Sequence, residues 1–194
     1  MKPSAVIRRR SPVQRFFMNI VLIGYRGSGK SAVGRRLAER LGRPFLDVDA
    51  LIEKRQKVSI QELVESSGWA HFREVEKKII DEVSRRDSGV IAPGGGAVLD
   101  PENVKSLKRK GFVIWLKAEP GVLARRLEGD ANTNRQRPTL TGKGTLEELK
   151  EVLLARTSYY QKAADAEIDT STLEPEGVVE EALRIIQGRR GETS

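Results

Sequence analysis

The sequence contains no cysteine and only one histidine, and these absences exclude several kinds of chemistry. Without cysteine, the chain can form neither disulfides nor thiolate metal sites. A single histidine, His71, cannot build a histidine-rich metal site, and a Ser-His-Asp mechanism would have to run through it. No partner stands at a telling spacing from His71, so we predict a structural or exposed role for it. No apolar run approaches the roughly 18 residues that a membrane-spanning helix needs.

Basic residues outnumber acidic ones by 35 to 27, but most of the excess lies at the N-terminus. Residues 1–17 contain five basic residues and no acidic one, which accounts for +5 of the net charge of +8. Such a tail can touch nucleic acid or a membrane, but it is more often solvated and disordered. It lacks the apolar stretch of a secretory signal. We therefore expect a disordered tail over 1–17, a single domain over 18–194 in the cytoplasm, and neither nucleic acid nor membrane as a partner.

From Met18 onward, segments of strand character alternate with segments of helical periodicity. This alternation predicts an α/β fold with a parallel sheet and helices on both faces. The predicted strands are 19–23, 45–48, 89–92, 111–116 and 166–169. The predicted helices are 30–41, 49–56, 60–67, 71–86, 101–110, 120–127, 145–162 and 175–187. The connection between the second and third strands is too long for one crossover helix, so we expect a small helical insertion at about 49–86.

The segment 24–31 reads G-Y-R-G-S-G-K-S, which is a phosphate-binding loop pattern. An apolar strand precedes it and an amphipathic helix follows it, as the pattern requires. Glycines let successive backbone N–H groups converge on phosphate oxygens, and the N-terminus of the helix adds partial positive charge. We expect Lys30 to reach the β- and γ-phosphates and the Ser31 hydroxyl to ligate Mg²⁺.

Two carboxylates, Asp47 and Asp49, stand at the end of the second predicted strand. Parallel sheets bind ligands at the carboxyl ends of their strands, where the phosphate loop also lies. Side chains alternate along a strand, so both carboxylates could point toward that crevice. One could hold Mg²⁺ through water, while the other accepts a hydrogen bond or proton from an attacking hydroxyl. The alternative is that either residue caps the helix that begins near Ala50.

Three consecutive glycines, Gly94, Gly95 and Gly96, follow the third predicted strand at the same edge of the sheet. They suit a backbone that approaches a ligand closely, although a loose turn would read the same way. Arg73 and Arg156 are candidates for binding a carboxylate, since a guanidinium offers two parallel hydrogen bonds. Taken singly, however, each fits a surface arginine better, because lone charges usually lie on solvated helix faces. Glu76 lies three residues after Arg73 and could pair with it on one helical face.

The stretch 128–144 is polar, contains glycine and has no periodicity. A loop of this length inside a compact domain is usually functional or disordered. Its basic residues Arg135, Arg137 and Lys143 favour a lid that closes over phosphates, with a plain solvated loop as the alternative.

Taken together, these motifs resemble those of the shikimate kinase family, a branch of the phosphate-loop proteins. The resemblance covers nearly all of residues 19–187. The matching segments are G-Y-R-G-S-G-K-S at 24–31, D-V-D at 47–49, F-R-E-V-E at 72–76, G-G-G-A-V at 94–98, R-P at 137–138 and R-T-S-Y-Y at 156–160. The phosphate loop alone identifies only a nucleotide-binding protein; the other motifs point to this family.

The resemblance implies a three-layer α/β/α fold with a five-stranded parallel sheet, and the phosphorylation of the 3-hydroxyl of shikimate by MgATP on the route to the aromatic amino acids. It implies that Lys30, Asp49 and Arg137 are catalytic, and that Ser31 and, through water, Asp47 hold Mg²⁺. The implied ATP-binding residues are Gly27, Ser28, Gly29, Lys30, Ser31, Ala32, Arg126 and Arg137. The implied shikimate-binding residues are Asp49, Arg73, Gly94, Gly95, Gly96 and Arg156. We expect a monomer.

Three features depart from the family pattern. Ala32 stands where threonine is frequent, the basic tail is extra, and the stretch between Arg126 and Arg137 is long. One alternative function is a kinase of another small polyol or acid, such as gluconate. A nucleic-acid-associated NTPase is less favoured, since residues 18–194 carry a net charge of only +3. The third alternative is a nucleotide-binding regulator without catalysis.

Overall fold

The computed structural model describes residues 18–129 and 146–191. These residues form one five-stranded sheet whose paired strands all run parallel, in the order β2-β3-β1-β4-β5. The strands are β1 (Asn19–Ile23), β2 (Phe45–Asp47), β3 (Val90–Ala92), β4 (Gly111–Lys117) and β5 (Ala166–Asp169). The predicted sheet is confirmed. The order reverses at β1, which places the loop after β1 at the switch point where parallel sheets bind ligands.

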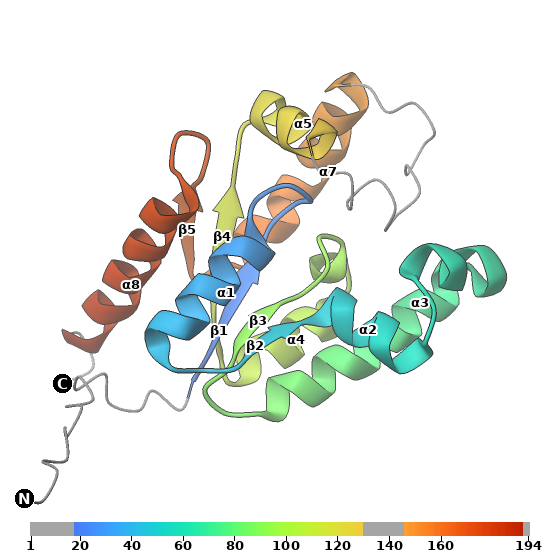
Figure 1. The fold of residues 1–194 in the computed structure, drawn as a ribbon, viewed down its shortest axis with the longest axis horizontal. Helices are drawn as coiled ribbons and strands as arrows, with labels where there is room; N and C mark the ends of the chain where they lie inside the picture. Colours follow the sequence, from blue (N-terminus) through green and yellow to red (C-terminus); the bar gives the residue numbers. More distant parts are fainter. Residues whose placement is uncertain (1–17, 130–145, 192–194) are drawn as a thin grey trace, which may run out of the picture.

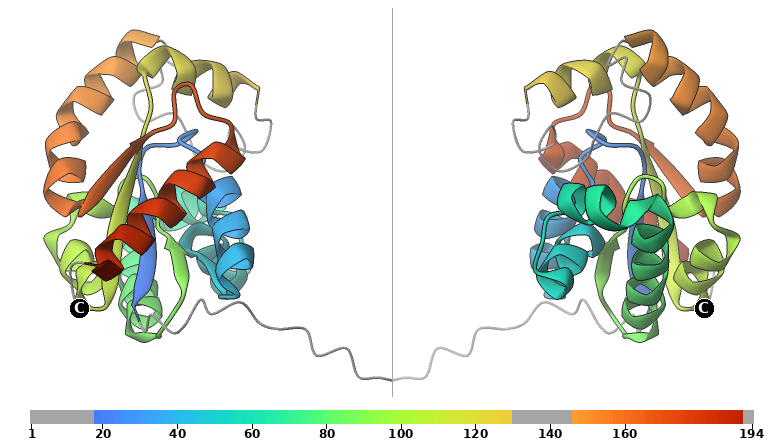
Figure 2. Two further views of the ribbon diagram at one scale, coloured as in Figure 1. Left: turned by 90° about the vertical axis from the view of Figure 1, so that its left-hand side faces the viewer. Right: turned by 90° about the vertical axis from the view of Figure 1, so that its right-hand side faces the viewer.

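Helices cover both faces of this sheet (Figures 1 and 2). The helices are α1 (Lys30–Leu41), α2 (Val48–Gln56), α3 (Ile60–Arg85), the short 3-10 helix η1 (Ala97–Leu99), α4 (Pro101–Arg109), α5 (Pro120–Glu128), α7 (Leu146–Ala163) and α8 (Pro175–Gly191). On one face, Ile20, Leu22 and Ile114 pack against α1 and α8. On the other, Val21, Ile23 and Val113 pack against α3, α4 and α7. This alternation along β1 and β4 explains why both strands read as continuous apolar runs.

Local chemistry sets several helix boundaries. Ser59 and Glu62 form a complete capping box at the start of α3, and Asp100 caps α4 ahead of Pro101. The two helices predicted at 60–67 and 71–86 form a single element that is kinked at Gly68, where φ is 79°. The last helix was predicted to end at 187, but α8 continues through Gly188 to Gly191.

The carboxyl ends of the strands are flanked by two groups of helices (Figure 1). On the β2 side lie α2 and the first turns of α3, within the predicted insertion. On the other side, α5 and α7 pack against one another beyond the end of β4. The loop between β1 and α1 lies between these two groups and therefore faces both. Among the described residues, no helix combines the length and apolar character needed to cross a bilayer.

Candidate active site

The glycine-rich segment after β1 forms a tight loop that leads directly into α1. Gly29 is the N-cap of α1 with φ 93°, a conformation that residues with a side chain rarely adopt. The Lys30 ammonium donates hydrogen bonds to the carbonyl oxygens of Gly24 and Tyr25, each at 2.9 Å. The first-turn backbone amides and the lysine thus face the same small region. This arrangement favours a bound phosphate chain.

Ser31 and Asp47 are brought together from two different strand ends. The Ser31 hydroxyl donates to Asp47 Oδ2 at 2.8 Å. The other oxygen of Asp47 accepts from the Ala50 backbone at 3.3 Å, so this residue also caps α2. Asp47 therefore combines the two roles that the sequence left as alternatives. A hydroxyl beside a carboxylate, next to a phosphate site, matches the oxygen donors that Mg²⁺ uses in kinases.

Asp49 lies in the first turn of α2 and is half-buried. The prediction that β2 continues through Val48 was wrong, because the Asp47 cap turns the chain into a helix one residue earlier. Strand alternation therefore does not relate Asp47 to Asp49. Asp49 nevertheless remains at the carboxyl edge of the sheet, two residues after Asp47.

Arg73 projects from the second part of α3 and pairs with Glu76, whose side chain is fully buried. The predicted pairing is thus confirmed. The guanidinium carbon also lies 5.1 Å from the centre of the Phe72 ring and 5.7 Å from that of Trp69. The Arg73 side chain remains 33% exposed. Its rigid placement leaves part of the guanidinium available to a ligand.

The three glycines connect β3 to η1 and are buried. A methyl group added at Gly96 would lie 2.6 Å from a guanidinium nitrogen of Arg73, so a side chain at this position would displace the guanidinium. At Gly95, an added methyl would lie 3.2 Å from the Gly24 carbonyl oxygen and 3.4 Å from the Arg26 nitrogen. The glycine turn thus lies directly against both the phosphate loop and Arg73. A close approach of backbones explains this run better than a loose turn does.

Arg156 lies on α7, and its guanidinium carbon is 5.8 Å from the centre of the Tyr25 ring. Tyr25 belongs to the phosphate loop, so this contact brings Arg156 to that loop. Arg156 thus borders the loop directly, whereas Arg73 lies beside the glycine turn that contacts the loop, although 83 positions separate the two arginines in the sequence. The structure brings together Lys30, Ser31, Asp47, Arg73, Gly95 and Arg156 around one edge of the sheet.

Arg126 lies on the other side of the phosphate loop. Its guanidinium donates to the Gly27 carbonyl oxygen at 3.4 Å and to the Thr170 carbonyl oxygen at 2.6 Å. Together with Gly27, Gly29 and Pro175 it lines a cavity of about 280 Å³. The cavity runs from the phosphate loop toward the start of α8. This position suits the nucleoside of a nucleotide whose phosphates occupy the loop.

The described part of the structure gives no contact that would support a role in the site for Arg137 or Ala32. Residues 130–145 lie outside the described residues, and they include Arg137 and most of the predicted lid. Ala32 is exposed in the first turn of α1. His71 is also exposed, in agreement with its predicted role.

Tyr160 is a residue whose part in the site could not be read from the sequence. Its buried hydroxyl donates to the Gly95 carbonyl oxygen at 2.5 Å. Its ring stacks on Trp115, with centroids 5.6 Å apart and planes 14° from parallel. Tyr160 stands one helical turn after Arg156 and closes the R-T-S-Y-Y segment that resembles the family, but neither signal assigned it a role. It ties the glycine turn to the helix that carries Arg156.

Replacing Tyr160 by phenylalanine should therefore loosen the glycine turn without removing the ring. We expect KM for the substrate bound by this turn to rise about fivefold to tenfold, because a lost hydrogen bond costs about 1 kcal/mol or somewhat more. Both kcat and KM for ATP should change less than twofold. Steady-state kinetics with each substrate varied will test this. Tyr159→Phe, at the exposed neighbour, is the matched control; an equal effect there, or a fall in kcat alone, would contradict a positioning role.

The parallel sheet, the phosphate loop at its switch point and the Ser31–Asp47 pair define a phosphate-loop nucleotide-binding protein with the parts of a phosphotransferase. The family model described as "Shikimate kinase" matches residues 26–187. A shikimate kinase of Syntrophus aciditrophicus is 44% identical over 180 residues, which cover 89% of this chain and 92% of that protein. One of Symbiobacterium thermophilum is 44% identical over 176 residues, which cover 90% of this chain and all of that protein.

Among solved structures, the shikimate kinase of Acinetobacter baumannii in complex with shikimate superposes with a TM-score of 0.83 at 32% identity. The match covers 89% of this chain and 94% of that one. The chain belongs to the shikimate kinase family.

Proposed function

We propose that this protein catalyses the transfer of the γ-phosphoryl group of ATP to the 3-hydroxyl of shikimate, in the biosynthesis of aromatic amino acids. Family membership over nearly the whole chain supports the reaction. The observation that carries it in the structure is the meeting of a phosphate loop with two arginines and a glycine turn at one sheet edge. The phosphate loop binds a nucleotide, and the two arginines with the glycine turn suit a small carboxylated polyol.

In the donor half of the site, the backbone amides from Gly27 to Ser31 hold the phosphates and Lys30 neutralises their charge. Arg126 borders the nucleoside, and Arg137 reaches the phosphates from the predicted lid. Ser31 would bind Mg²⁺ directly and Asp47 through a water molecule. When bound, Mg²⁺ supplies positive charge to the phosphate oxygens during transfer.

In the acceptor half, Arg73 and Arg156 bind the carboxylate of shikimate through charge-assisted hydrogen bonds. The backbone of Gly94, Gly95 and Gly96 lies against the hydroxyls of the ring. Asp49 accepts a hydrogen bond from the 3-hydroxyl and orients it. Its position two residues beyond Asp47, in the first turn of α2, supports this role, because the acceptor must meet the γ-phosphate.

The transfer forms one bond and breaks another. The 3-hydroxyl oxygen attacks the γ-phosphorus, and the bond from that phosphorus to the β,γ-bridging oxygen breaks, which releases ADP. The proton of the hydroxyl passes to Asp49 as the new bond forms. Positioning and charge neutralisation provide most of the rate enhancement in such reactions. We further propose a cytoplasmic monomer, with the working domain beginning at Met18.

A coupled assay of ADP release, run with shikimate and separately with gluconate, tests the proposal. We expect turnover with shikimate, dependent on Mg²⁺, and a phosphomonoester product detectable by ³¹P NMR. Turnover with gluconate alone would instead favour the alternative polyol kinase. ADP release that does not depend on either acceptor would contradict a kinase role. The protein starting at Met18 should be as active as the full chain.

A further inference from the structure

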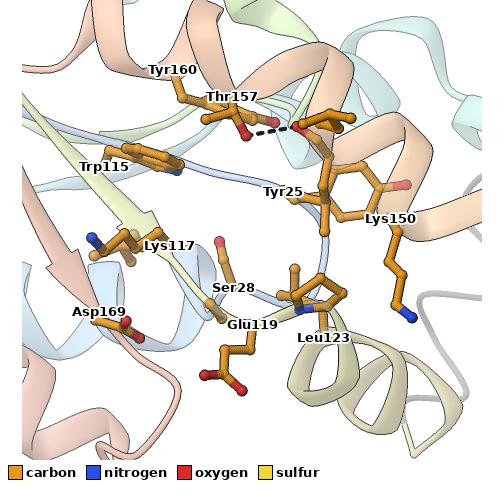
Figure 3. A pocket seen from close by; sticks show the side chains of 15 residues that line it. Tyr25, Ser28, Trp115, Lys117, Glu119, Leu123, Lys150, Thr157, Tyr160 and Asp169 are labelled. Atoms are coloured by element: carbon orange, nitrogen blue, oxygen red, sulfur yellow. Dashed lines mark hydrogen bonds between the residues drawn. The ribbon is translucent and has the colours of Figure 1, made fainter. Parts of the chain in front are cut away.

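A second cavity, of about 380 Å³, lies behind the phosphate loop, apart from the nucleoside cavity and from the two arginines of the proposed carboxylate clamp (Figure 3). It is open on one side and is bordered by the end of β4, by α5 and by α7. Its lining shares Tyr25 and Ser28 with the phosphate loop but includes neither arginine of the proposed carboxylate clamp. The volume lies within the usual range for small-molecule pockets, near its lower end. It suits a single ring with a short substituent.

The walls of this cavity are aromatic and aliphatic. Trp115, Tyr25 and Tyr160 contribute rings, and Leu123 and Leu153 complete the apolar surface. Figure 3 shows the Trp115 and Tyr25 rings on opposite sides of the enclosed space. Aromatic surfaces favour planar aromatic ligands, which gain from offset or edge-to-face stacking beyond simple burial.

A polar group of the phosphate loop points into the apolar space. The Ser28 side chain is only 1% exposed, and its hydroxyl has no hydrogen-bond partner within the described part of the chain. In Figure 3 this hydroxyl is directed between Trp115 and Tyr25. A buried hydroxyl without a partner costs free energy. A ligand that carries a hydroxyl on its ring would satisfy Ser28.

Charged side chains line the mouth of the cavity, and two of them, Lys117 and Asp169, already have partners within the protein. Lys117 pairs with Glu167 at 2.7 Å, and this hydrogen bond raises the pKa of the lysine. Asp169 accepts from the Ser171 backbone at 2.9 Å, and hydrogen bonds from Ser171 lower the pKa of that carboxyl. Both side chains are therefore held in place and charged at neutral pH.

Two other charged side chains line the mouth, Lys150 and Glu119, and both residues are exposed. Figure 3 shows Glu119 extending away from the enclosed space, while Lys150 extends from α7 along the side of Tyr25 and Leu123. Neither side chain forms an ion pair within residues 18–129 and 146–191. Lys150 is thus the charge that a ligand anion can meet at this rim.

We propose that this cavity is a binding site for a small planar aromatic carboxylate with a ring hydroxyl. The ring lies between Trp115 and Tyr25, the hydroxyl meets Ser28 and the carboxylate meets Lys150. Tyr25 also contacts Arg156, and Tyr160 holds Gly95. An occupant therefore touches the acceptor half of the active site from behind and is placed to regulate it.

The probe for the test is 4-hydroxyphenylacetate, titrated into the full-length protein in saturating shikimate. The chain has two tryptophans, which report on different places. Trp115 lines the cavity, whereas Trp69 lies beside Arg73 of the clamp. Their indole N–H signals in ¹⁵N NMR, assigned with Trp69→Phe, should separate the two locations. We expect the Trp115 signal to shift with saturation and the Trp69 signal to remain in place.

Calorimetry with matched variants and ligands tests the chemistry. Lys150→Gln should weaken binding of the probe about threefold to fivefold, as expected for an exposed ion pair. Lys162→Gln, an exposed lysine on the same helix that does not line the cavity, should leave it unchanged. The uncharged analogue 2-(4-hydroxyphenyl)ethanol should bind the wild type and Lys150→Gln equally. Cyclohexylacetate should bind more weakly than the probe.

Several results would overturn the proposal. They are the absence of binding, a shift of Trp69 alone, complete displacement of the probe by shikimate, and equal losses in Lys150→Gln and Lys162→Gln. The NMR and calorimetric readouts measure binding and not turnover. The outcome for this cavity is therefore independent of the outcome for the kinase activity: either proposal can be contradicted while the other is supported.

Discussion

Replacing Arg156 by alanine is expected to raise KM for shikimate roughly 30-fold to 150-fold while KM for ATP changes less than twofold. A hydrogen bond to a charged group contributes about 2–3 kcal/mol, and each 1.4 kcal/mol corresponds to a factor of ten. The Arg156 guanidinium lies against Tyr25 at the acceptor side of the phosphate loop. Its loss should therefore weaken the binding of the carboxylate and leave the nucleotide unaffected.

Initial rates with each substrate varied in turn will measure this effect. Lys162→Ala is the control, since it removes an exposed positive charge from the same helix. Arg156→Lys should recover only part of the loss, because an ammonium cannot make the two parallel hydrogen bonds of a guanidinium. Equal increases in both KM values would place Arg156 outside the carboxylate site.

Replacing Lys30 by methionine is expected to lower kcat by about 10²-fold to 10³-fold, the usual cost of removing one preorganised donor to developing charge. Lys30 is the first residue of α1, and its ammonium lies within the phosphate loop. Methionine preserves most of the apolar stem, so the principal loss is the positive charge. KM for shikimate should remain within about threefold of the wild type.

Single-turnover measurements of phosphoryl transfer will separate this effect from product release. Lys54→Met, on the exposed side of α2, controls for the loss of a lysine in general. Thermal unfolding should be similar for both variants. A Lys30→Met protein that keeps more than a tenth of the wild-type rate would contradict the catalytic role of Lys30, and a wild-type protein with no phosphoryl transfer would favour a nucleotide-binding regulator.

The parts of the site that are local in the sequence could be predicted from it. The phosphate loop needs a strand, glycines and a helix in immediate succession, and residues 19–41 contain all three. The Arg73–Glu76 pair follows from helical spacing, which places residues three apart on one face. The local pattern did give one wrong prediction, the strand that was to continue through Val48. Asp47 caps α2 and ends β2 one residue earlier, so strand alternation does not set the direction of Asp49.

The contacts that join distant segments could not be predicted in this way. The family resemblance implies that Arg73, Gly96 and Arg156 share one site. No local pattern, however, indicates that Tyr160 binds the Gly95 carbonyl, that Arg156 lies against Tyr25, or that Gly96 borders Arg73. Each of these contacts depends on the packing of separate helices against the sheet. The cavity behind the phosphate loop is of the same kind, since its lining comes from four separated segments.

The sequence by itself determined the chemical inventory of this protein: a loop for phosphates, carboxylates for a metal and a hydroxyl, and arginines for an acid. Local hydrogen bonds and side-chain periodicity are sufficient to encode each of these parts. Only the tertiary structure decided which parts meet. The parallel sheet brings the ends of β1, β2 and β3 to one edge, and helix packing then places Arg73 beside the glycine turn and Arg156 beside the phosphate loop. Burial of apolar faces drives that assembly, and it acts between residues far apart in the chain.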